Sequence, residues 1–189
     1  KALDLDPTHL GAATTLANLL LNRGALEAAR DVLGPFAAQG IPHVLVALSA
    51  IACKQGRIDD AETLISQAIA NAPRHVLARL VAARISDVRG YPKAAHMQLE
   101  AAHAFAPNVS EAIDRIDAMR MRDEADALVR KGDMKAALAL LVAALKHDPE
   151  APLIHLRLAD VLDRIGDPKR ARESRERAMA LAPGLMASE

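Results

Sequence analysis

The chain has 189 residues, of which 51% are hydrophobic and 25% are charged, as in an ordinary folded protein and not a disordered segment. Its 24 basic and 24 acidic residues balance and only 2% of its residues are aromatic, which argues against binding nucleic acid by tracking phosphates or stacking bases. The one cysteine, Cys53, excludes an intramolecular disulfide and a four-cysteine zinc site.

The first residues do not look like the start of a domain. Lys1–Pro7 (KALDLDP) reads as the last turn of a helix followed by proline, so residues 1–9 are predicted to be the end of a preceding repeat helix. We therefore expect a fragment, or the ordered part, of a longer protein. The composition is typical of a bacterial protein, and the compartment, cytoplasm or periplasm, stays open because an upstream signal would not be visible.

Regularly spaced glycines divide the rest of the chain. They are Gly24, Gly56, Gly90, Gly132 and Gly166, at spacings of 32, 34, 42 and 34 residues. An alanine follows each glycine by five residues, and a proline follows each of the last four by seventeen. Glycine ends one helix, alanine lets a second helix pack closely against it, and proline stops that second helix. Each period therefore predicts a pair of antiparallel helices.

Self-similarity at this period predicts an all-α solenoid. Aligned on the glycines, three repeats occupy residues 10–109 and two more occupy residues 118–185. The five units are 10–41, 42–75, 76–109, 118–151 and 152–185, with an insertion at 110–117 that extends a helix and a tail at 186–189.

Two features interrupt the regular pattern near its start and at its end. Gly34-Pro35 falls inside the second helix of the first unit, which is two residues short, and predicts a kink or an early end of that helix. The last second helix, Pro168–Ala182, is far more charged than its counterparts. Arg175 there replaces the apolar residue of the other units, which favours the natural end of the array, because terminal repeats need a polar outer face.

The insertion, Ser110–Asp117, adds eight residues before the fourth unit. No Pro or Gly occurs from residue 110 to Lys131, so we expect one helix of about 33 Å at about 1.5 Å per residue. Its mixed charges favour a solvated extension of the helix. The alternative is a joint between two half-arrays, and Glu124 supports it because this position is Leu in units one, two and five.

The sequence shows little that could carry out chemistry. None of the seven histidines forms a pair that would place two metal ligands on one helical face. Neither a nucleophile elbow nor a glycine-rich phosphate loop occurs, and no apolar run is long enough to span a bilayer. We therefore predict no enzymatic activity, no cofactor and no metal, and we interpret Cys53 as a small buried hydrophobe and not a reactive thiol.

The glycine, small-residue and proline positions resemble the tetratricopeptide repeat (TPR) family, in a bacterial-type array, over nearly the whole chain. The sequence departs from the family at its aromatic positions, where it has Leu45, Leu20, Ile65 and Leu141. The resemblance implies a right-handed superhelical solenoid of antiparallel helix pairs, whose first helices line a concave groove. RNA-reading helical repeats of similar period are a weaker match, because they usually carry a basic surface.

The resemblance also implies where a partner would bind. Transferring the family's groove positions one residue at a time gives Asn18, Asn22, Lys54, Arg84, Asp87, Arg122, Asp126, Arg130, Asp160 and Arg164. A clamp for a chaperone's terminal carboxylate is not expected, since Thr14, Ala50 and Leu80 depart from it.

The implied function is a non-catalytic scaffold for a protein or peptide partner of unknown identity, with no nucleic acid and no membrane span. Two alternatives stay open. One is an accessory TPR region of a larger enzyme or of an exopolysaccharide or secretion complex. The other is a self-assembling scaffold.

Overall fold

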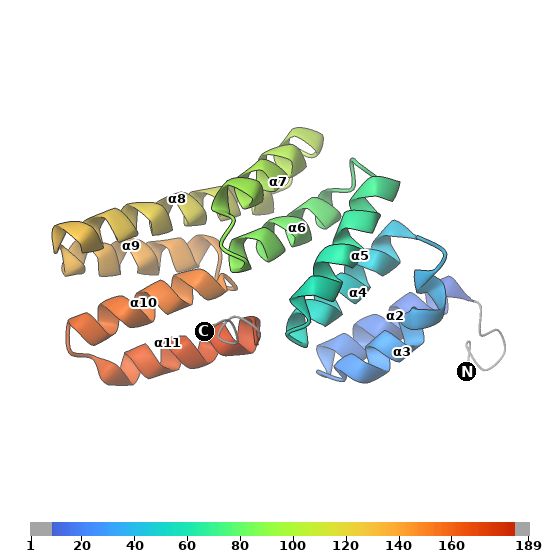
Figure 1. Ribbon diagram of the computed structural model, residues 1–189, viewed down its shortest axis with the longest axis horizontal. Helices are drawn as coiled ribbons and strands as arrows, with labels where there is room; N and C mark the ends of the chain where they lie inside the picture. Colours follow the sequence, from blue (N-terminus) through green and yellow to red (C-terminus); the bar gives the residue numbers. More distant parts are fainter. Residues whose placement is uncertain (1–8, 184–189) are drawn as a thin grey trace.

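The computed structural model describes residues 9–183, so the predictions for residues 1–8 and for the tail at 186–189 lie outside the described part. Within residues 9–183 every regular element is a helix. These are α2 (Leu10–Asn22), α3 (Leu26–Ala37), α4 (Pro42–Lys54), α5 (Ile58–Asn71), α6 (Val76–Val88), α7 (Pro92–Phe105), α8 (Ser110–Lys131), α9 (Met134–His147), α10 (Pro152–Arg164) and α11 (Pro168–Leu181). Consecutive helices form antiparallel pairs that stack into a solenoid (Figure 1). The predicted all-α, right-handed superhelical array is confirmed.

The glycine and alanine positions act as the sequence predicts. Gly132 ends α8 with a φ of 84°, in the left-handed region that penalises a side chain, and its N–H donates to the carbonyl of Val129. Ala125 of α8 and Ala137 of α9 are both fully buried in the same apolar cluster. Such small side chains let two helix backbones approach closely.

Proline shapes the second helix of the first unit. Pro35 lies inside α3, and the helix ends two residues later at Ala37, so that α3 has 12 residues. The second helices of the other units, α5, α7, α9 and α11, have 14 each. The early end predicted from Gly34-Pro35 is confirmed.

Three side chains on the first helix of a unit hold it against the preceding unit. We call these residues, at positions i, i+4 and i+7, the docking triad. In α4 the triad is Val44, Leu48 and Ile51, which pack with Leu33 and Phe36 of α3. In α6 the docking triad is Ala78, Ala82 and Ile85. In α10 it is Ile154, Leu158 and Val161. All nine side chains are buried, and all stand 12, 8 and 5 residues before the glycine of their own unit.

In α8 the docking triad is displaced. Glycine alignment places it at Arg120, Glu124 and Ala127, but the side chains that pack against α6 and α7 are Ala112, Ile116 and Met119. These lie eight residues earlier, the length of the insertion. The fourth unit, whose first helix is α8, is therefore shifted by about 12 Å along that helix and rotated by just over two turns, at about 1.5 Å and 100° per residue.

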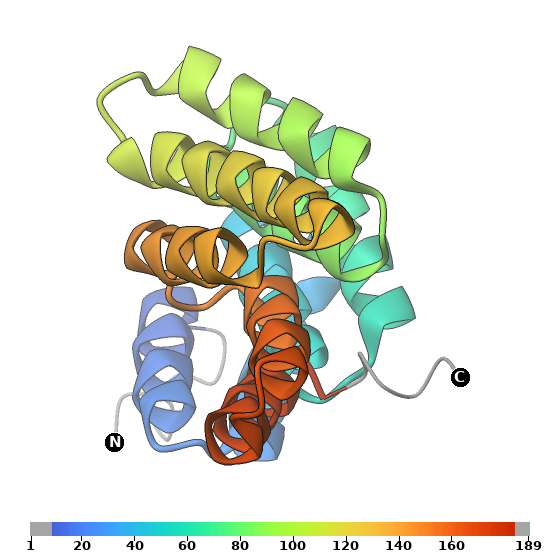
Figure 2. The same ribbon diagram turned by 90° about the vertical axis from the view of Figure 1, so that its left-hand side faces the viewer.

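The first part of α8 is thus a joint between two half-arrays and not a solvated extension. One half-array comprises α2–α7 and the other α8–α11. Beyond the joint the second half-array curls back, so that the end of α11 points towards α4 and α6 (Figure 1). Figure 2 shows the pair α10–α11 beneath α8–α9, on the same side of the molecule as α2–α3.

Candidate functional site

A cleft opens on the concave side of the first half-array, where the second half-array curls back towards it. Its water-accessible volume is about 200 Å³. The first half-array contributes Ala50, Cys53, Lys54, Ile58, Val81, Arg84, Ile85 and Val88, and the second contributes Arg115, Glu150, Pro152, Ala180, Leu181 and Ala182. Most of these side chains are apolar, and the exposed Lys54 and Glu150 add one cation and one anion. The arrangement suits an apolar segment that also carries an acidic group.

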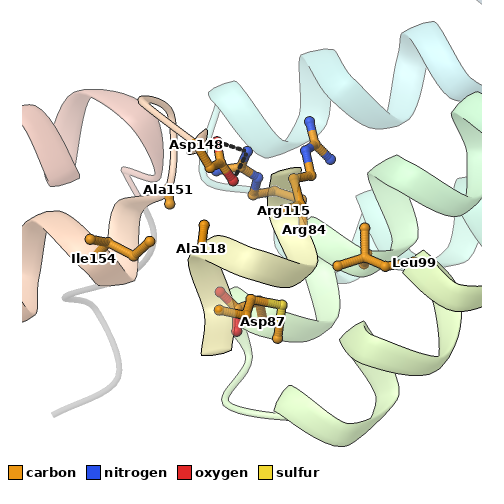
Figure 3. Close-up of a pocket in the computed structure, with 10 residues that line it drawn as sticks. Arg84, Asp87, Leu99, Arg115, Ala118, Asp148, Ala151 and Ile154 are labelled. Atoms are coloured by element: carbon orange, nitrogen blue, oxygen red, sulfur yellow. Dashed lines mark hydrogen bonds and ion pairs between the residues drawn. The ribbon is translucent and has the colours of Figure 1, made fainter. Parts of the chain in front are cut away.

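Arg84, one of the predicted groove residues, is bonded within the chain. Its Nη2 lies 2.9 Å from both carboxylate oxygens of Asp148, in the turn between α9 and α10. Its Nη1 donates to the carbonyl of Glu150. The Arg84 and Asp148 side chains are 20% and 13% exposed. Arg84 therefore fastens α6 of the first half-array to the second through its bond to Asp148 (Figure 3), and it is also one of the residues that line the cleft.

Asp87 and Arg122, two more predicted groove residues, are buried and paired with each other. Nη1 of Arg122 in α8 donates to both carboxylate oxygens of Asp87 in α6, at 2.7 and 2.8 Å. Burial acts to lower the pKa of Arg122, but the charges and hydrogen bonds of Asp87 and Asp123 outweigh it and the pKa is raised. Neither side chain is available to a partner, so this pair holds the joint together and does not line a binding surface.

Arg115, which the sequence did not single out, completes the joint. Its Nη1 donates to the carbonyl of Leu80 at 2.9 Å, and its Nη2 lies 2.7 Å from Glu111. Burial, followed by the charge of the neighbouring Arg84, lowers the pKa of this guanidinium. Arg115 lies beside Arg84 and Asp148 around a small cavity of about 20 Å³ (Figure 3). The hydrogen bond from Arg115 to Leu80 joins residues 35 positions apart in the sequence, and no local sequence pattern predicts it.

The remaining predicted groove residues lie away from the joint. Asn18, Arg130, Asp160 and Arg164 are exposed and Asp126 is half-buried. The two acidic residues belong to surface ion pairs, since Arg157 lies 3.4 Å from Asp126 and 3.8 Å from Asp160. The side chain of Asn22 lies outside the described part of the structure. Of the ten residues, Lys54 and Arg84 line the cleft.

Cys53 lines the cleft as a neutral thiol. Burial raises its pKa to about 11, and the positive charge of Arg84 lowers it only in part. A thiol with this pKa is almost fully protonated near pH 7 and is a poor nucleophile. Its environment agrees with a packing role.

Two features are absent from residues 9–183. Within that range His, Cys, Asp and Glu side chains form no group of three that could hold a metal ion. None of the helices of the same range is both long and apolar enough to cross a membrane.

A sequence model of the tetratricopeptide repeat matches residues 47–110 and 122–185, on either side of the displaced joint. The chain belongs to the tetratricopeptide repeat family. The two matched segments together cover well over half of the TPR chain, and the unmatched residues between them coincide with the first turns of α8.

Known proteins similar to this TPR chain include one sequence relative and several solved structures. This chain is 32% identical over 150 residues to Cellulose synthase 2 operon protein C of Komagataeibacter xylinus, and the match covers 78% of this chain and 11% of that protein. The chain thus spans about a tenth of the length of this curated relative.

Two of the solved structures are TPR proteins. YrrB, described as a TPR protein with an unusual peptide-binding site, has a TM-score of 0.54 and 16% identity over 96% of this chain and 91% of YrrB. TTC0263, a thermophilic TPR protein of Thermus thermophilus, has a TM-score of 0.51 and 20% identity, over 92% and 91% of the two chains. At these identities the likeness shows the fold alone.

Proposed function

We propose that this chain is a non-catalytic scaffold that holds a segment of another protein in the cleft between its two half-arrays. The observation that carries the proposal is the apolar lining of the cleft, supplied by α4 and α6 on one side and by the end of α11 on the other. A preorganised surface of this kind lowers the entropic cost of capturing a flexible peptide.

The chemistry of the cleft defines the preferred ligand. The half-buried Val81 and Val88 present aliphatic surface along α6, and Ala50 leaves room on α4. Lys54 would pair with a carboxylate of the bound segment. The ligand is therefore a short aliphatic stretch with an acidic residue near one end. Of the predicted groove residues, Lys54 contacts it directly, while Arg84, Asp87 and Arg122 position the cleft walls.

A second candidate function is an accessory role within a larger assembly. The 32% identity to Cellulose synthase 2 operon protein C favours it, because this chain corresponds to a small part of that protein. The two functions are compatible, since an accessory TPR region acts by holding partner proteins. Sequence flanking the chain in its full-length protein would decide between a free-standing scaffold and a part of an assembly.

The test is a peptide selection with a matched counter-selection. A displayed peptide library is selected on the intact chain, and the affinities of the recovered peptides are measured by fluorescence anisotropy. The cleft variant carries Lys54→Glu and Val88→Glu. The control variant carries the same two kinds of change outside the cleft, Lys146→Glu and Val142→Glu on α9, where both side chains are exposed.

We expect aliphatic, acidic peptides that lose at least tenfold in affinity for the cleft variant and retain it for the control. Peptides that bind all three proteins equally would refute the cleft as the site. Arg84→Glu is unsuitable for this purpose, because it would also break the bond to Asp148 that holds the half-arrays together.

A further inference from the structure

The docking triad of the first unit is apolar but uncovered. Glycine alignment places it at Ala12, Leu16 and Leu19 of α2. Leu16 is 37% exposed and Leu19 is 55% exposed, whereas their counterparts in α4, Leu48 and Ile51, are 6% and 0% exposed. Two adjacent leucines on one face of a helix form a surface that water does not favour.

Elsewhere in this chain, uncovered docking positions are polar. The regular triad positions of α8 are not used for docking, and two of them carry Arg120 and Glu124, both exposed. At the other end of the array, α11 carries Arg175 where α3 uses Leu33 to cover the next unit, and Arg175 pairs there with Asp163. The chain thus places charges on such faces where they meet water, and apolar side chains where they are covered.

We propose that the α2 face formed by Ala12, Leu16 and Leu19 is covered by a further helix pair of the same repeat type, lying N-terminal to α2. The second helix of that pair presents apolar side chains where α3 presents Leu33 and Phe36 to the docking triad of α4.

Sequence before α2 agrees with this occupant. Relative to the repeat, Ala2, Leu3 and Pro7 stand where the second unit has Ala68, Ile69 and Pro73. Those are the residues of the last turns of a second helix and of the turn that follows it. The size of the curated relative, of which this chain spans 11%, leaves room for further repeats.

A second copy of this chain is a poorer occupant. Stacked end to end, it would offer the face of α11, where Arg175 and the exposed Glu176 would meet Leu16 and Leu19. Burying these charges against leucine would cost more than the leucines gain. This inference does not rest on the cleft or on the proposed function.

The test supplies the missing unit from the chain's own sequence. A copy of residues 9–40 is joined directly to His9, which preserves the 32-residue period, so that the copied Leu33 and Phe36 meet the α2 face. Hydrogen exchange of the α2 amides and the midpoint of urea unfolding are measured for the chain and for the fusion. We expect α2 exchange to slow at least tenfold in the fusion and the midpoint to rise.

The control places Leu16→Gln and Leu19→Gln in the receiving α2. In the unfused chain these changes should lower the urea midpoint less than in the fusion, since Leu16 and Leu19 are 37% and 55% exposed there. In the fusion they should abolish the protection. Unchanged α2 exchange in a fusion whose added helices have formed would overturn the proposal. A dimer of the unfused chain that the two glutamines dissociate would also overturn it, in favour of a second copy as occupant.

Discussion

Replacement of Asp87 by alanine is the sharpest test of the joint between the half-arrays. The side chain of Arg122 is 6% exposed and that of Asp87 is 11% exposed, and a single nitrogen of Arg122 bonds both carboxylate oxygens. Removing one partner of a buried ion pair costs about 3–5 kcal/mol, because the other charge is left buried without compensation. Asp123 still lies 3.2 Å from Arg122, but it is 63% exposed, and such pairs contribute at most about 1 kcal/mol. We therefore expect a loss of about 3 kcal/mol.

The assay is urea unfolding followed by circular dichroism, with two comparison proteins. Arg120→Ala removes an arginine of the same helix from an exposed pair with Asp117, and should cost about 1 kcal/mol or less. The double variant Asp87→Leu, Arg122→Met replaces the pair by apolar side chains. It should be far less destabilised than the sum of its single changes, because neither charge is left alone. A loss below about 1 kcal/mol for Asp87→Ala, or a double variant as unstable as that sum, would refute the reasoning.

Three further predictions concern the aligned positions Glu124 and Leu158, two glycines, and Cys53. Glu124→Leu should change the free energy of unfolding by less than about 0.5 kcal/mol in the same urea assay, although aligned units carry leucine there, because Glu124 is exposed. Leu158→Glu, at the aligned and buried position of α10, should cost about 3 kcal/mol or more. In thermal unfolding, Gly34→Ala should stabilise by about 0.5–1 kcal/mol, since no heavy atom within 4 Å would meet the added Cβ. Gly132→Ala, at φ 84°, should destabilise by about 1–2 kcal/mol. If both substitutions changed the free energy of unfolding in the same direction, the left-handed conformation of Gly132 would not be what separates the two glycines. Iodoacetamide should alkylate Cys53 at pH 8 about 100-fold more slowly than a cysteine of pKa 9.0, because burial raises its pKa to about 11. Because the pKa of Cys53 is higher in the folded chain, the contribution of the buried neutral thiol to the free energy of unfolding is complete below pH 9.0 and is lost as the pH rises towards 11. Alkylation as fast as that of free cysteine would show that Cys53 is not buried.

The sequence by itself determined the helices, their pairing and the family. Helix boundaries depend on local conformational preferences, so that Gly132 and the prolines place them without reference to the rest of the chain. Small residues such as Ala125 and Ala137 predict close helix pairs because their size alone sets how near two helices can come. Even the long helix from Ser110 to Lys131 follows from the lack of a breaking residue.

Only the tertiary structure decided which face of α8 meets the preceding unit. Both Ala112–Ile116–Met119 and the regular positions eight residues later lie on a helix, and helical periodicity does not choose between them. The choice depends on which face buries apolar surface against α7 and satisfies Asp87, and that is settled by contacts between units.

The same limit applies to the groove residues. Family positions predict that Arg84, Asp87 and Arg122 line the groove, but in the structure each of them bonds a side chain of the other half-array. Whether a charged side chain is free or paired depends on partners 35 or 64 residues away in the sequence. A displacement of eight residues along one helix brought those partners within hydrogen-bonding distance, and no local pattern in the sequence records that distance.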